Sequence, residues 1–160
     1  VNADKWIFYT GNFTLDLWPD QPFYQQEGKD LGERMADAFQ KAFKAGYQQV
    51  ILIGSDLPDL TQNLIEDAFN SLQRADVVFG PASDGGYYLI GLTKMHRFLF
   101  EHKPWSTSNL LQITREELQR EKVGYVLLEE LNDIDTYEDY VSSSIFKQQK
   151  EPKKKNERSY

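Results

Sequence analysis

Apolar runs alternate with amphipathic segments along most of the chain. Residues 50–53 are four consecutive apolar residues, the pattern of a strand that is covered on both faces, as in a parallel sheet. Residues 31–43 repeat apolar side chains about every four positions, which predicts a helix that Gly46 ends. Further strands are expected at 5–10, 23–26, 76–80, 86–92 and 125–129, and further helices at 64–72, 107–121 and 136–146. This alternation predicts parallel crossovers in a layered α/β domain.

Length and charge divide the chain into a body and a tail. The 160 residues suit one globular domain, which we place at residues 1–146. Residues 147–160 carry six Lys or Arg and two Glu, so the tail contributes +4 to a net charge of −7 and the body carries −11. A basic end of this kind is typical of a solvated, disordered terminus, and contact with RNA or anionic lipid is the alternative.

Composition excludes several function classes. An acidic body argues against a nucleic-acid groove, and no apolar run is long enough to span a membrane. The absence of cysteine excludes disulfides and thiolate chemistry and is compatible with a reducing compartment, so we expect a cytoplasmic protein. His96 and His102 lie in a polar stretch and are expected at the surface, which leaves the serines without a partner for a hydrolase triad.

The strongest local signal for function follows the strand at 50–54. Gly54 ends this strand, and Asp56 comes directly after it, at the edge of the sheet where ligands bind in open α/β folds. A carboxylate placed there suits Mg²⁺ that carries phosphate oxygens. The alternative reading is that Asp56 only caps a turn.

Three other loops carry candidate residues. A glycine-bearing turn ends at Asp30 and feeds a helix, whose N-terminus can bind an anion or can simply be capped by Asp30. In the loop at 81–88, Asp84 could deprotonate an acceptor hydroxyl, although Asp-Gly-Gly is also a common turn. Residues 132–136 could supply a second metal carboxylate or a helix cap, and residues 105–107 could contact a sugar or pack locally.

In combination, these pieces resemble a bacterial family of GT-A-like proteins related to nucleotide-diphospho-sugar transferases. This family was long known as a domain of unknown function and is now often labelled as glycosyltransferases of arsenosugar biosynthesis. More distantly, the chain resembles phospholactate and molybdenum-cofactor guanylyltransferases. The matching pieces are Asp30-Leu31-Gly32-Glu33-Arg34-Met35, Gly54-Ser55-Asp56-x-Pro58-Asp59-Leu60, Gly80-Pro81-Ala82-x-x-Asp84-Gly85-Gly86-Tyr87-Tyr88-Leu89, Trp105-Ser106-Thr107 and Asp133-Ile134-Asp135-Thr136-x-Glu138-Asp139.

The resemblance implies a fold and a set of roles. The fold would be a three-layer, Rossmann-like GT-A domain with a mostly parallel sheet, and Mg²⁺ or Mn²⁺ would be held by Asp56 and Asp135. The nucleotide would lie near Gly28, Asp30, Leu31, Gly32, Arg34, Ser55 and Asp56. The acceptor would lie near Gly85, Gly86, Tyr87, Trp105, Ser106 and Thr107, with Asp84 as the base.

The front of the chain departs from this family. Members normally begin with a strand, a basic loop and a helix, none of which precedes Val1. The first strand would be central in the sheet, so its absence predicts a gap between unpaired neighbours in a truncated chain.

The function expected from the resemblance is a metal-dependent glycosyltransferase that acts on a nucleotide-diphosphate sugar and a small-molecule acceptor. One alternative is a nucleotidylyltransferase that joins an NTP to a phosphorylated acceptor. The other is a nucleotide-binding domain without turnover, because a fold does not fix an activity. The sequence does not specify the sugar, the nucleotide base, the acceptor or the oligomeric state.

Overall fold

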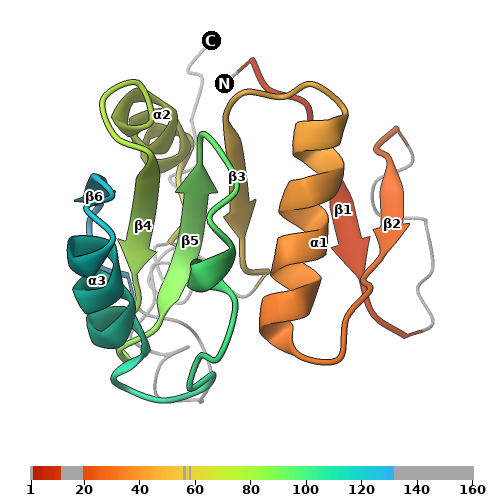
Figure 1. Cartoon of the computed structure of the whole chain (residues 1–160). Coiled ribbons are helices and arrows are strands. Elements are labelled where there is room, and N and C mark those ends of the chain that lie inside the picture. The colour runs from red at the N-terminus through yellow and green to blue at the C-terminus, as the bar shows by residue number, and fades with distance from the viewer. Residues whose placement is uncertain (1, 12–19, 56, 58, 132–160) are drawn as a thin grey trace, which may run out of the picture.

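The computed structural model describes residues 2–11, 20–55, 57 and 59–131 (Figure 1). The expected helix at 136–146 and the basic tail at 147–160 lie outside these residues. The strands are β1 (Ile7–Tyr9), β2 (Phe23–Gln25), β3 (Val50–Ile53), β4 (Val77–Pro81), β5 (Tyr87–Leu92) and β6 (Tyr125–Leu127). The helices are α1 (Leu31–Lys44), α2 (Gln62–Ser71) and α3 (Leu110–Arg120), with a short 3₁₀ turn at Arg97–Leu99.

The described strands form two sheets. β1 and β2 pair in parallel, whereas the larger sheet has the order β3-β5-β4-β6. β5 runs antiparallel to both β3 and β4, and β6 runs parallel to β4. Three of the four strands in the larger sheet therefore point the same way. β5 returns from β4 by a short loop, which gives the predicted parallel sheet one reversed strand.

Helices cover both faces of the larger sheet. Val77 and Phe79 of β4 face a core built with α1 and α3, whereas Val78 faces a second core built with α2. This division follows from the strand itself, because successive side chains point to opposite faces. All five residues of β4 are buried, as the apolar run predicts. The expected three-layer α/β domain is confirmed.

Local sequence signals set most helix ends. The side chains of Asp30 and Thr61 cap α1 and α2 by accepting hydrogen bonds from backbone N–H groups three residues on. α3 begins at Leu110 rather than at the expected Thr107. The difference arises because the Thr107 hydroxyl lies 2.6 Å from the Pro104 carbonyl oxygen and 2.7 Å from Asn109 Oδ1, and so holds a turn instead.

Candidate functional site

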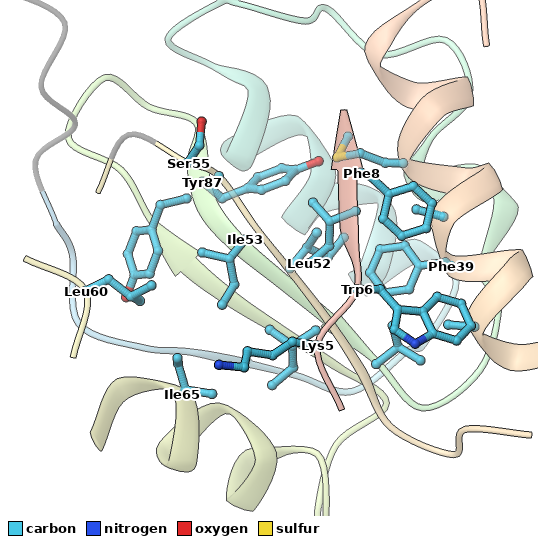
Figure 2. A pocket seen from close by; sticks show the side chains of 18 of the residues that line it. Lys5, Trp6, Phe8, Phe39, Leu52, Ile53, Ser55, Leu60, Ile65 and Tyr87 are labelled. Carbon is cyan, nitrogen blue, oxygen red and sulfur yellow. The ribbon is translucent and has the colours of Figure 1, made fainter. Parts of the chain in front are cut away.

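A deep groove lies between β1 and β3 (Figure 2). Its volume is about 1720 Å³, and its walls include side chains of α1 and α2 as well as both strands. At one end, the groove reaches the carboxyl end of β3 and the loop between β4 and β5. Parallel strands deliver their loops to this edge, which is where open α/β sheets bind ligands.

The groove gathers most of the predicted site residues. Those that line it are Leu31, Arg34, Ser55, Asp84, Gly86, Tyr87, Trp105, Ser106 and Thr107. The four that do not line it are Gly28, Asp30, Gly32 and Gly85. Asp56 and Asp135, the predicted metal ligands, lie outside the described residues. The structure therefore brings together residues from four separate segments of the sequence without testing the metal assignment.

Asp84 is presented by a tight turn between β4 and β5. Its Oδ1 accepts a hydrogen bond of 2.8 Å from the Gly86 N–H, and the Gly85 N–H donates to the Ala82 carbonyl at 3.0 Å. The side chain is exposed at the groove. One carboxylate oxygen thus fixes the turn at this end of the groove.

Two glycines hold this end of the groove together by close packing. A Cβ at Gly85 would lie 1.9 Å from the Ser108 carbonyl oxygen, and φ at Gly85 is +89°. A Cβ at Gly32 would lie 2.1 Å from the Phe100 carbonyl oxygen and 2.6 Å from the Trp105 ring. Gly32 and Gly85 therefore allow backbone segments to approach one another, and their contacts with ligands stay predictions.

The loop that carries Trp105 is anchored by an ion pair that the sequence analysis missed. The Lys103 side chain is fully buried, and its ammonium group pairs with the Glu117 carboxylate on α3. A lone Lys in a polar loop gives no local sign of this, because its partner lies 14 residues away. Beyond the anchor, Ser106 adopts a positive φ of 61°, which is uncommon for a residue other than glycine.

The N-terminus of α1 is closed by its own side chains. Asp30 Oδ1 accepts from the Glu33 N–H at 2.8 Å, and Glu33 Oε2 accepts from the Lys29 N–H at 2.8 Å. The Arg34 side chain donates to the Gly28 carbonyl oxygen at 3.3 Å. Asp30 therefore serves as the N-cap, and a role for it in nucleotide binding stays a prediction.

Substitution at Asp30 separates these two roles. We expect Asp30→Ala to lower the free energy of unfolding by about 1 kcal/mol, because the Glu33 N–H loses its acceptor. Asp30→Ser should restore stability, since Ser caps helices equally well. Urea unfolding of the two variants checks this expectation. Equal stability of Asp30→Ala and the parent chain would contradict it.

Tyr87 and His96 carry buried polar atoms without hydrogen-bond partners among the described residues. Burial raises the pKa of the Tyr87 hydroxyl and lowers the pKa of His96, because each charged form would be poorly solvated. The expectation that His96 is a surface residue was wrong for its Nε2 atom. The His96 ring packs edge-on against Phe98, two residues on, with 5.7 Å between the ring centroids.

A metal site does not emerge from the described residues alone. Nowhere in the described ranges do three His, Cys, Asp or Glu side chains converge. Asp84 and the Ser55 side chain both supply oxygen donors at the groove, the donor chemistry that Mg²⁺ and Mn²⁺ use.

No described helix is long and apolar enough to cross a membrane.

Comparison with known proteins identifies a family and a similar structure for this chain. Residues 2–107 match the family described as "Uncharacterized protein conserved in bacteria (DUF2064)". The chain belongs to this family. It is also similar to a crystal structure from Desulfovibrio desulfuricans G20 named "putative nucleotide-diphospho-sugar transferase", with 38% identity and a TM-score of 0.84. The match covers 96% of this chain and 69% of that chain. No curated protein matches.

The similarity confirms the expected GT-A-like fold and family. The family match over residues 2–107 includes the end of β3, the Asp84 turn and the Trp105 loop. All of the groove's lining residues except Leu110 therefore lie in the matched part of the chain.

Proposed function

We propose that this DUF2064 protein is a metal-dependent glycosyltransferase that takes a nucleotide-diphosphate sugar as donor. The observation that carries the proposal is the convergence of Ser55, Asp84 and Trp105 at one end of the groove, on a fold similar to that of a protein named for this class. Each comes from a different loop, and all lie at the edge of the sheet that binds ligands.

The described residues suit a polar, ring-shaped substrate. The Trp105 ring offers an apolar face of the kind on which a sugar packs, and the exposed Ser106 hydroxyl lies beside it. The Thr107 hydroxyl forms hydrogen bonds within its own turn. Thr107 would therefore contact the acceptor through its backbone and its methyl group. Arg34 adds a positive charge at the groove, which suits a diphosphate.

Asp84 is the proposed general base. Its second carboxylate oxygen would accept the proton of the acceptor hydroxyl as that oxygen attacks the sugar carbon and the bond to the nucleoside diphosphate breaks. This base favours a hydroxyl acceptor over the phosphate acceptor of a nucleotidylyltransferase, which needs no proton removed. Asp56 and Asp135 are the proposed ligands of Mg²⁺ or Mn²⁺, which when bound would neutralise negative charge on the diphosphate.

A ligand panel tests the proposal. Thermal unfolding is followed with nucleoside diphosphates, their sugars and NTPs, each with and without Mn²⁺. A true donor should stabilise the chain by about 2.7 kcal/mol at a hundredfold excess over its dissociation constant. Mn²⁺ should be required, and Asp56→Ala should abolish the Mn²⁺-dependent part of the response.

Three results would contradict the proposal in different ways. If no compound in the panel raises the unfolding temperature, the proposed donor binding is wrong. A response to NTPs with pyrophosphate release would assign nucleotidylyl transfer instead. Binding without transfer to any hydroxyl acceptor would favour a nucleotide-binding domain without turnover.

A further inference from the structure

A buried ion pair holds the loop that leads to Trp105. The side chain of Lys103 has no exposed surface, and its ammonium group pairs with the Glu117 carboxylate on α3. The ammonium group also lies 6.0 Å from the centre of the Phe98 ring. A lysine is almost never fully buried unless it is paired, so Glu117 is what permits Lys103 to lie inside the protein.

Such a pair contributes little to stability in itself. Taking the charges of Lys103 and Glu117 out of water costs free energy that their attraction offsets only in part, and apolar residues of similar volume often stabilise a fold equally well. An ion pair differs from apolar packing in its direction, because the ammonium group must meet its carboxylate whereas methylene groups can slide past one another. The pair therefore suits the positioning of a loop better than the stabilisation of the fold.

The backbone on both sides of Lys103 adopts a conformation that needs support. The φ angle is 55° at His102 and 61° at Ser106, in the left-handed region that is uncommon for residues other than glycine. Between them, the Trp105 N–H donates to the Lys103 carbonyl oxygen at 2.9 Å. Conformations of this kind persist where the surrounding structure holds them, and they are frequent at ligand sites. The ion pair of Lys103 supplies such a constraint.

The helix that carries Glu117 also holds the Asp84 turn. The Leu111 N–H, in the first turn of α3, donates to the Gly85 carbonyl oxygen at 3.0 Å. Glu117 lies six residues further along the same helix. One helix thus contacts both the Asp84 turn and the Trp105 loop, and residues of both line the groove. It therefore fixes the position of the loop relative to the turn.

Packing of the Trp105 ring is the competing explanation for its position. The ring is partly buried against the core, and it lies so close to Gly32 that a Cβ there would approach it to 2.6 Å. If packing alone held the ring, an apolar substitute for the ion pair would leave it in place. The two explanations therefore differ in a measurable way.

We propose that Lys103 and Glu117 are positioning residues of the acceptor side, and that their pair fixes the Trp105 ring at the groove so that a sugar acceptor can pack on it. This role rests on the proposed function, because it requires that Trp105 contacts the acceptor. Neither charged residue lines the groove, so both act through Trp105 without touching the substrate. A ring that is already held in place loses less side-chain entropy on binding than one that must first be ordered.

The double variant Lys103→Met/Glu117→Leu tests the positioning role without any substrate. It leaves no unpaired charge buried, so its unfolding temperature should be no lower than that of the parent chain. The mobility of the Trp105 indole N–H is measured by ¹⁵N NMR relaxation. We expect its order parameter to fall from about 0.85 to below about 0.6, the change from a rigid to a flexible group. The order parameter of the Trp6 indole should stay unchanged.

Lys94→Met is the matched control. Lys94 pairs with Asp76 at 2.8 Å, its side chain is 61% exposed, and it follows the end of β5 that lies away from the Asp84 turn. The same substitution therefore breaks an ion pair that does not involve the Trp105 loop. The order parameter of the Trp105 indole in this variant should equal that of the parent chain.

Transfer kinetics test the role at the acceptor. The donor is the nucleotide sugar with the largest Mn²⁺-dependent response in the ligand panel, and the acceptor probes are the methyl glycosides of glucose, galactose and mannose. In the double variant the KM for the acceptor should rise about 2- to 13-fold, the cost of ordering one side chain on binding. The kcat at saturating acceptor and the donor affinity should each stay within about twofold, because the Asp84 turn is unchanged.

The outcomes separate this proposal from the proposed function. An unchanged order parameter of the Trp105 indole in the double variant would overturn the positioning role and would assign the position of the ring to packing. A mobile ring with an unchanged KM, or no transfer to any of the methyl glycosides, would overturn the acceptor role. A ligand panel without any response would overturn the proposed function and the acceptor role together, and the NMR result would still decide the positioning role.

Discussion

Gly85→Ala should lower the free energy of unfolding by about 2–6 kcal/mol, since steric overlap and backbone strain each cost about 1–3 kcal/mol. A Cβ at this position would meet the Ser108 carbonyl oxygen at 1.9 Å, which belongs to backbone and cannot rotate away. The positive φ of +89° adds the strain of a conformation that side chains disfavour. The measurement is urea or thermal unfolding, in which the midpoint temperature should fall by about 4–24 °C.

Gly124→Ala is the matched control. A Cβ at Gly124 would meet nothing within 4 Å, and its φ is not positive. Its effect should stay within about 0.5 kcal/mol. Equal stability of the two variants would contradict the packing that we describe between the Asp84 turn and Ser108.

Asp84→Asn should lower kcat for sugar transfer by about 10²- to 10⁴-fold, the usual contribution of a general base. The Asn side chain still presents an oxygen to the Gly86 N–H, so the turn should persist and thermal stability should match that of the parent chain. The measurement is the transfer rate with the donor that the ligand panel identifies. Donor affinity should change little, because Asp84 is assigned to the acceptor side.

Asp84→Ala separates the structural role from the chemical one. It removes both the base and the acceptor for the Gly86 N–H, so it should lose activity and also about 1 kcal/mol of stability. If Asp84→Asn keeps the parent kcat while Asp84→Ala does not, the carboxylate serves only to shape the turn.

The elements that depend on local residues were predicted well. The apolar run at 50–53 forms β3, and the repeat at 31–43 forms most of α1. Asp30 caps its helix through a partner three residues away, so a short stretch of sequence contains the whole signal. The prediction of a helix end is wrong where a side chain competes for backbone hydrogen bonds, as Thr107 does before α3.

The site was predicted in part. Residues in four segments were expected near a ligand, and most of them line one groove. The packing role of Gly32 and Gly85 was not predicted, because a glycine that permits contact with a ligand and one that permits contact with another loop look the same in sequence. The roles of Asp56 and Asp135 in metal binding remain predictions.

The sequence by itself determined the α/β class, the family resemblance, most strand and helix positions, and the residue types available for chemistry. These depend on periodicity and on partners a few residues apart. Only the tertiary structure decided that β5 runs antiparallel between β3 and β4, that Lys103 pairs with Glu117, and that β1 and β3 face each other across an apolar groove. Each of these joins residues far apart in the chain, and no local pattern specifies which distant partner packs best.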